Sequence, residues 1–204
     1  MTFTPTSIAA LIVAISFAAG LNVYATIATL GILARFHWVA LPSGLDALSN
    51  TWVVAISVFL FCIEVFADKV PAFDLLWNAA HTFIRVPVSA FLAYHAASHL
   101  TPELQLLATV AAALITSVSH GSKTAARTLV SGSPEPFSNI ALSATEDGAA
   151  IGLTWLATHH PYTAATIAAV CLLVMVFCVR WVIRQLKRSW SRRPAWLRSN
   201  QSST

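Results

Sequence analysis

Long apolar stretches separated by short polar breaks run along the whole chain. The apolar runs lie at residues 7–34, 50–67, 82–97, 102–119, 138–159 and 161–179. Most approach the roughly 20 residues that a helix needs to cross the hydrocarbon core of a bilayer. The pattern predicts an all-α polytopic helical membrane protein with about six transmembrane helices, and it places residues 1–179 in a single transmembrane domain.

Polar and helix-breaking positions interrupt this pattern at three places. The first run contains Gly20-Leu-Asn22, and the fourth ends in His120-Gly121, after which a short helix to about residue 130 can continue it. After Pro71, the segment 73–81 has the pattern of a short amphipathic or re-entrant piece. Interrupted helices often form the binding sites of transporters.

The two halves of the chain resemble each other weakly. In each, an interrupted helix leads through a loop to a Ser-Asn step, at 49–50 and at 138–139, and a helix with acidic residues follows. Residues 7–97 and 102–179 are therefore two candidate repeats of three spans, and an odd number of spans inverts the second copy. The pattern predicts a three-plus-three inverted repeat with interrupted first and fourth helices. The alternative is two hairpins that look alike because Gly, Ser and Asn are common at helix breaks.

Composition supports the membrane class. Hydrophobic residues make up 57% of the chain, charged residues 10%, and the mean hydropathy is +0.71. A soluble globular domain carries about 25% charged residues. This balance excludes a soluble enzyme, a disordered chain and a nucleic-acid-binding domain as leading interpretations. The three cysteines all lie in apolar runs and are expected to be packing residues.

The distribution of basic residues predicts a topology. Seven of the 12 Lys and Arg residues lie in the tail 180–204, which we expect to be partly disordered. With both termini in the cytoplasm, every basic residue except Arg35 falls on the cytoplasmic side, as the positive-inside rule favours. We therefore predict a multi-pass protein of the bacterial inner membrane. The basic tail is expected to contact anionic lipid headgroups, a small bundle can also form a homodimer, and nucleic acid is not expected as a partner.

Polar residues within the apolar runs are the candidates for function, because a charged group at lipid depth costs at least about 2.5 kcal/mol and usually faces a bundle interior. The candidates for transport or for a polar cavity are Asn22, Glu64, Asp68, Asp74, His81, Arg85, His120, Lys123, Arg127, Asn139, Glu146 and Asp147.

Two groups of these candidates lie in the first half. Glu64 and Asp68 are four residues apart and share a helix face, although Asp68 fits a solvated interfacial position equally. Asp74, His81 and Arg85 share a second face together with a tryptophan. A His and an Arg on one stripe can bind an anion or relay a proton. An interfacial helix with a tryptophan anchor fits the same spacing.

The third group combines the basic residues His120, Lys123 and Arg127 with Glu146 and Asp147. The two acidic residues lie near the middle of the fifth run, where at least one should be paired or protonated. Lys123 or Arg127 can supply the partner if the fourth helix is broken and folds inward. The alternative is an ion pair that only locks two helices together.

Other chemistry is weakly indicated. Asn22 and Tyr24, at the first helix break, can coordinate a solute or satisfy freed backbone groups. His95 and His99 have the spacing of two metal ligands, but two ligands alone are weak support for a metal site, and no metal or cofactor is predicted. The common nucleophile, phosphate-loop and zinc motifs do not occur, so no enzyme is predicted.

Two blocks of sequence resemble a known family. The run from Ala67 through Pro71, Trp77 and His81 to Arg85 (ADKVPAFDLLWNAAHTFIR) resembles the signature of a bacterial integral membrane family catalogued only as domain of unknown function 4126. The block SPEPFSN at 133–139, followed by the acidic pair at 146–147, resembles its second signature. The resemblance covers about residues 18–156. It implies the membrane class and the same polar clusters, and it implies no activity.

The leading hypothesis is a small transporter or channel for a solute or ion, with a polar cavity between the two halves. Glu146 and Asp147 would hold a proton or cation, and Arg85 and Lys123 would supply counter-charge or bind an anion. One alternative is a non-transporting scaffold whose polar clusters fix helix register. Another is a membrane enzyme that acts on lipid headgroups with His81 as base.

Overall fold

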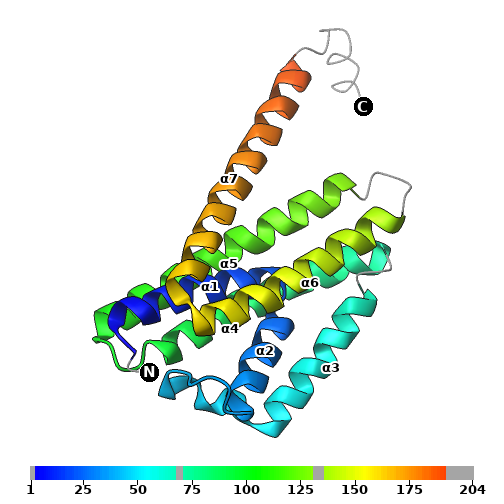
Figure 1. Cartoon of the computed structure of the whole chain (residues 1–204). Helices are drawn as coiled ribbons and strands as arrows, with labels where there is room; N and C mark the ends of the chain where they lie inside the picture. Colours follow the sequence, from blue (N-terminus) through cyan, green and yellow to red (C-terminus); the bar gives the residue numbers. More distant parts are fainter. Residues whose placement is uncertain (1–2, 68–70, 131–135, 192–204) are drawn as a thin grey trace.

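The computed structural model describes residues 3–67, 71–130 and 136–191, and every regular element in this part of the chain is a helix (Figure 1). The elements are α1 (Pro5–Leu21), α2 (Val23–Arg35), the 3-10 helix η1 (Ser43–Ser49), α3 (Thr51–Ala67), α4 (Pro71–Ala96), α5 (Pro102–Val130), α6 (Pro136–His159) and α7 (Pro161–Ser191). The predicted all-α class is therefore confirmed.

Local sequence explains where the first two helices begin and end. Thr4 caps α1 by accepting a hydrogen bond from the Ser7 amide at 3.2 Å, and Pro5 occupies the first turn, where its missing N–H costs nothing. Asn22 adopts an extended conformation, φ −151° and ψ 106°, which stops α1. Its side-chain Oδ1 then accepts from the Ala25 amide at 2.9 Å and starts α2. The predicted interruption of the first apolar run is confirmed at Asn22.

Helix α1 is the centre of the bundle. Twelve of its 17 residues are buried, and it packs against α2, α4, α5, α6 and α7. A helix that is apolar on every face has to be covered on every face. Gly20 lets α1 approach α5 closely, because a Cβ at this position would lie 2.6 Å from the Cβ of Ser119.

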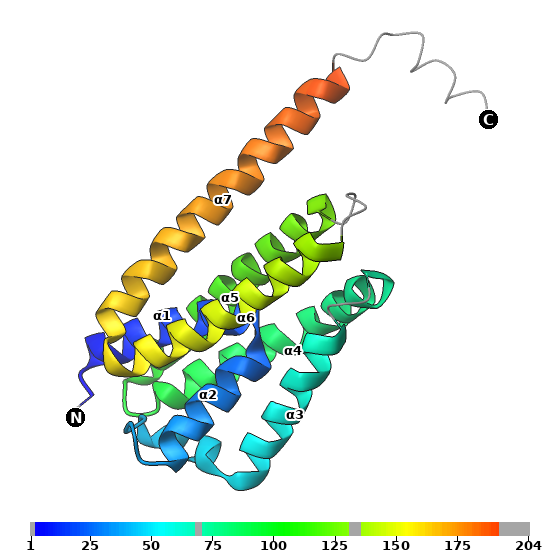
Figure 2. The same cartoon turned by 45° about the vertical axis from the view of Figure 1, so that its right-hand side comes forward.

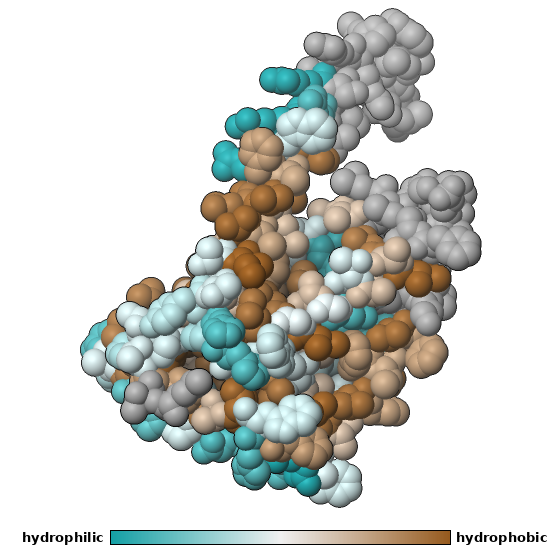
Figure 3. All heavy atoms as spheres, viewed as in Figure 1, coloured by the Kyte–Doolittle hydropathy of each residue, from teal (hydrophilic) through white to brown (hydrophobic). Residues whose placement is uncertain are grey.

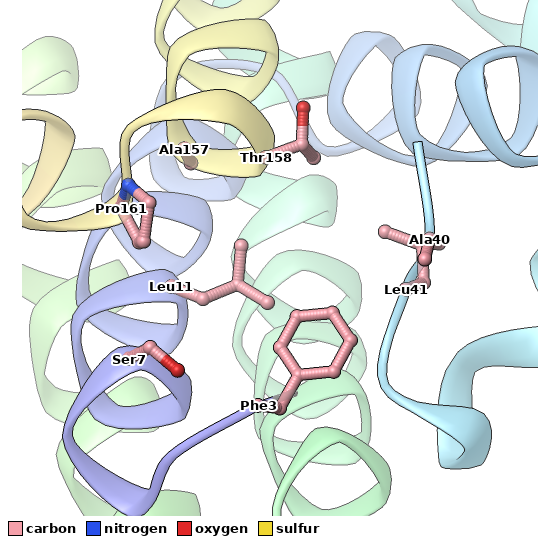
Figure 4. A pocket seen from close by; sticks show the side chains of 8 residues that line it. All are labelled: Phe3, Ser7, Leu11, Ala40, Leu41, Ala157, Thr158 and Pro161. Atoms are coloured by element: carbon pink, nitrogen blue, oxygen red, sulfur yellow. The ribbon is translucent and has the colours of Figure 1, made fainter. Parts of the chain in front are cut away.

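The two halves of the interrupted run fold back on each other instead of forming one span. Figure 2 shows α1 entering the bundle from the N-terminal end and α2 returning toward that end. A cavity of about 300 Å³ confirms the arrangement, because it is lined by Phe3 and Ser7 before and within α1, by Leu41 after α2, and by Pro161 at the start of α7 (Figure 4). In addition, the hydroxyl groups of Thr6 and Tyr162 lie 2.9 Å apart. The predicted first helix is thus a hairpin of two helices.

This hairpin places the two ends of the described chain at opposite ends of the bundle. Residues 3–7 lie beside the start of α7, and the 31 residues of α7 then extend about 46 Å to the far end (Figures 1 and 2). The prediction that both termini lie on one side of the membrane stays a prediction.

Two further predictions about helices are wrong. The helix α5 is continuous through His120-Gly121, so the fourth apolar run has no interruption there, and the predicted three-plus-three repeat loses one of its two matching breaks. The segment 73–81 is not a separate piece but the first part of the 26-residue α4. In both regions the helical period is unbroken, and a single Gly or His does not stop a helix that is supported by packing on its neighbours. The sixth run also continues as helix to Ser191, beyond the expected end near residue 179.

The outer surface of the bundle is apolar, as a membrane protein requires. Two helices, α5 and α7, are long and apolar enough to cross a membrane, and the bent pair η1–α3 makes a third candidate. Large apolar side chains face outward on several helices, with Leu173 and Phe177 of α7 at 72% and 70% exposure. Figure 3 shows apolar surface along the lower and middle part of α7 and hydrophilic surface toward its C-terminal part.

Candidate functional site

The break at Asn22 leaves the last carbonyl groups of α1 without partners from the helix itself. The final carbonyls of any helix have no intrahelical donor, and they carry the negative end of the helix dipole. Because α1 ends inside the bundle, Gly20 and Leu21 are both buried, so these carbonyls have to be satisfied by buried donors.

Two cationic side chains from different helices bind this carbonyl end. Arg85 of α4 donates from one terminal nitrogen to the carbonyl oxygens of Gly20 and Leu21, at 3.1 and 3.0 Å. Lys123 of α5 donates from Nζ to the Leu21 carbonyl at 2.7 Å. Positive charge is favourable at a helix C-terminus, so the helix break explains why two cations are tolerated in the core.

Two carboxylates neutralise these cations. Glu64 of α3 forms an ion pair with Arg85 and lies 3.9 Å from Lys123 Nζ. Glu146 of α6 lies 3.1 Å from the same Nζ. Glu64 and Arg85 have no exposed surface, Lys123 is 2% exposed and Glu146 is 9% exposed. Buried charges of this kind are stable only when they are paired and hydrogen-bonded.

His120 extends the network. Arg85 lies 3.0 Å from Nδ1 of His120, and Thr82 Oγ1 lies 2.9 Å from its Nε2. A guanidinium group can only donate, so a hydrogen bond between these two side chains has Nδ1 as its acceptor.

Asp147 and His81 both contact residues at the start of α2. Asn22 Nδ2 donates to Asp147 Oδ1 at 2.8 Å, which places this carboxylate near the N-terminus of α2, where negative charge is favoured. Tyr24 in the first turn of α2 hydrogen-bonds His81 Nε2 at 3.0 Å, and the two rings meet edge to face. Asn22 thus joins the two helices and also holds an acidic residue beside them.

The described contacts of this cluster join three carboxylates, those of Glu64, Glu146 and Asp147, with the cations Arg85 and Lys123 and the amide of Asn22. Ionised groups are costly in an apolar interior, so each of them is expected to be paired or neutralised by a proton.

The structure brings together most of the candidates that the sequence indicated. Asn22, Glu64, His81, Arg85, His120, Lys123, Glu146 and Asp147 all lie around the α1–α2 break, and all are buried. Lys123 reaches Glu146 although α5 is not broken, because α1 ends between their helices. Asp68 lies outside the described residues, as do the side chains of Asp74, Arg127 and Asn139.

The histidines at the N-terminal end of the bundle do not join this cluster. His99 lies after α4 and hydrogen-bonds the hydroxyl group of Ser43, whereas His95 is in the last turn of α4. In the described parts of the chain, no group of three or more His, Cys, Asp and Glu side chains could hold a metal ion.

Sequence reasoning did not identify the acceptors to which the cations bind. These are the backbone carbonyls of Gly20 and Leu21, which have no side-chain signature. The available signal was the predicted helix break, because a break inside an apolar run always frees carbonyl groups. Thr82 was also missed, since a threonine on a helix is common and only its neighbour His120 gives it a role.

A cavity of about 400 Å³ leads from the cluster to the outside between α5, α6 and α7. Its walls are mostly apolar, and Lys123 and Glu146 are the charged residues in its lining. The buried ionic cluster therefore has contact with accessible space through these two residues.

Apolar helices with exposed hydrophobic side chains, arranged around a buried ionic cluster, define a helical membrane protein. The chain belongs to the family described as "Domain of unknown function (DUF4126)", which matches residues 9–181. No curated protein and no solved structure matches the chain.

Proposed function

We propose that this protein transports a proton or another cation across the membrane, alone or coupled to a solute, and that the ionic cluster is its binding site. One observation carries the proposal: ionisable side chains from α3, α4, α5 and α6 converge on the open carbonyl end of α1 inside an apolar bundle. Discontinuous helices with ions at their ends are the usual construction of transporter sites.

The contacts of Arg85 and Lys123 support a proton or cation rather than an anion as the ligand. Both side chains already bind a carboxylate and a carbonyl group of α1. Glu146 and Asp147 are adjacent on α6 and less completely buried than Glu64. They are therefore the groups that we expect to exchange protons or cations with the surroundings.

The fold supports a revised topology for this function. We infer that α3 to α7 cross the bilayer, whereas α1 and α2 enter and leave on one side. Arg180, Arg184 and Arg188 lie in the C-terminal half of α7, and Arg35 lies at the end of α2, toward the opposite end of the bundle. The positive-inside rule then favours a cytoplasmic C-terminal tail that contacts anionic lipid, and an N-terminus on the outer face of a bacterial inner membrane.

Proton flux into proteoliposomes tests the proposal. A pH gradient is imposed across the membrane of vesicles that contain a trapped pH-sensitive dye. The measurement is made without added solute and then with pools of amino acids, sugars, nucleosides or organic cations. In at least one condition, we expect the wild-type chain to discharge the gradient about tenfold or more faster than the Glu146→Gln, Asp147→Asn double variant. Glu103→Gln is the matched control, because Glu103 is an exposed carboxylate on α5 far from the cluster.

Equal proton flux through the wild type and the double variant in every condition, at equal reconstitution, would contradict transport. The remaining interpretation would then be a scaffold in which the cluster only holds α3 to α6 on the helix break. A scaffold role predicts that the Glu146→Gln, Asp147→Asn variant loses thermal stability while its proton flux equals that of the wild type.

A further inference from the structure

The ammonium group of Lys123 lies among oxygen atoms from three other helices. Its Nζ is 2.7 Å from the Leu21 carbonyl oxygen at the end of α1, 3.1 Å from Glu146 Oε2 of α6 and 3.9 Å from Glu64 Oε1 of α3. The side chain of Lys123 has no exposed surface. Carbonyl and carboxylate oxygens are also the ligands that hard metal cations prefer in proteins. Lys123 therefore holds its charge in surroundings that suit a small cation.

Arg85 binds the same end of α1. One of its terminal nitrogens lies 3.1 Å from the Gly20 carbonyl oxygen and 3.0 Å from that of Leu21, and Arg85 also forms an ion pair with Glu64. In transporters with discontinuous helices, carbonyl groups at a helix end commonly coordinate the transported cation. Here the carbonyls of Gly20 and Leu21 instead contact positive charges that belong to the chain itself.

We propose that the Lys123 ammonium group occupies the position of a monovalent metal cation in the ionic cluster, and that the transported ion is therefore a proton. The second part names the substrate of the proposed transporter and rests on that function, whereas the first part does not. A lysine ammonium group is a compact point charge, so a free cation can replace it without changing the charge of the cluster. While Lys123 and Arg85 are present, they repel a metal ion from these oxygen atoms. A proton binds to a single oxygen and needs no such group of ligands.

A metal cation can reach this position once the lysine is removed. The cavity of about 400 Å³ between α5, α6 and α7 has Lys123 and Glu146 in its lining. Lys123→Ser removes most of the side chain and adds a hydroxyl oxygen, which leaves a space that joins this cavity and is bordered by the oxygens of Leu21 and Glu146. Lys123→Met also removes the charge, but it fills the space with apolar atoms.

Thermal unfolding of the purified full chain in detergent tests the first part of the proposal. The midpoint temperature of unfolding (Tm) is measured in chloride salts of sodium, potassium or N-methylglucamine at equal concentration. We expect the Tm of Lys123→Ser to be about 3 °C or more higher in sodium or potassium than in N-methylglucamine, as for a ligand present at roughly ten times its Kd. The Tm of the wild type should be the same in all three salts, because its own ammonium group fills the position.

Lys123→Met is the matched control for this measurement. Both variants lose the ammonium group and should unfold at a lower temperature than the wild type, but the Tm of Lys123→Met should not respond to the metal ions. An equal response of the two variants, or no response of Lys123→Ser to either metal ion, would overturn the proposal. If Lys123→Ser does not fold in any salt, Lys123→Ala replaces it, since alanine leaves a similar space and favours the helix.

Proton flux through wild-type proteoliposomes tests the second part. In the condition that gives flux, the flux should be equal with sodium, potassium or N-methylglucamine as the other cation on both sides, with a permeant anion present to balance charge. A flux that requires sodium or potassium, or that a gradient of either ion drives, would overturn the assignment of the proton. Absence of flux in every condition would contradict the transport function alone, because the salt dependence of the Tm of Lys123→Ser does not require transport.

Discussion

Arg85 is the side chain with the most demanding position in the molecule. It has no exposed surface, and it binds Glu64, His120 and two carbonyls of α1. The sequence placed it on a helical face with His81 and left open whether it bound an anion or reached the interface. Its side chain instead connects three elements within the core. With these partners, Arg85 is expected to contribute to the stability of the fold.

Replacing Arg85 with methionine is predicted to destabilise the protein by about 3–5 kcal/mol, because Glu64 would keep a buried charge without its strongest partner. The Glu64→Gln, Arg85→Met double variant should recover part of this loss. Its recovery should be incomplete, since the carbonyls of Gly20 and Leu21 also lose a donor. Thermal unfolding in detergent, followed by circular dichroism, measures both effects. Additive losses in the double variant would show that the two residues do not interact.

Gly20 is predicted to tolerate no side chain. A Cβ here would lie 2.6 Å from Ser119 Cβ and 3.0 Å from the Thr116 carbonyl oxygen, so Gly20→Ala has to push α1 away from α5. We expect a loss of about 1–3 kcal/mol, as for other overpacked cores.

Gly121→Ala is the matched control for this prediction, because nothing lies within 4 Å of a Cβ there and alanine favours the helix by about 1 kcal/mol. Adding Ser119→Gly to Gly20→Ala should restore part of the stability. Thermal unfolding of the wild type and these three variants provides the measurement, and a stable Gly20→Ala protein would show that α1 and α5 are not packed this closely.

At the scale of elements, the break between α1 and α2 organises the site. Both helices are apolar and short, with 17 and 13 residues, and their single separating residue stops one and caps the other. The break was predictable, because Gly20 and Asn22 are two poor helix formers that lie two positions apart in an apolar run. The direction in which α2 leaves was not predictable, because one extended residue can turn the chain several ways.

Replacing Asn22 with alanine is predicted to loosen the start of α2. The helix loses its cap, which is worth about 1 kcal/mol, and Asp147 loses the amide that donates to it. Hydrogen exchange should therefore accelerate at the amides of the first turn of α2 and remain unchanged in η1. Uniform acceleration across both helices would indicate global destabilisation instead of a local cap.

At the scale of the whole molecule, the proposed topology has one testable consequence. If α1 and α2 enter and leave the membrane on the same side, Thr4 and Ala47 lie on that side and Gln185 lies toward the other. A spanning first helix would instead separate Thr4 from Ala47. The two topologies therefore differ in whether Thr4 and Ala47 lie on the same side of the membrane.

Labelling of single cysteines measures on which side of the membrane each of these residues lies. In a background with the three native cysteines replaced by serine, Thr4→Cys and Ala47→Cys should both react with a membrane-impermeant maleimide in intact cells. Gln185→Cys should react only after lysis, and it is the control for membrane integrity. Reaction of Ala47→Cys without reaction of Thr4→Cys would restore the spanning first helix.

The amino-acid sequence by itself determined the all-helical class, the apolar runs and most of the residues of the cluster. Apolar periodicity and charge placement are local properties, and a charge within an apolar run has to find a partner wherever the helices go. Only the tertiary structure decided which partners these are. The contacts of Arg85 and Lys123 with carbonyls of α1 join residues more than 60 positions apart, as does the contact of Asn22 with Asp147. Such contacts depend on the angle between α1 and α2 at Asn22 and on how α1 packs between α4, α5 and α6. A local sequence pattern predicts neither of these.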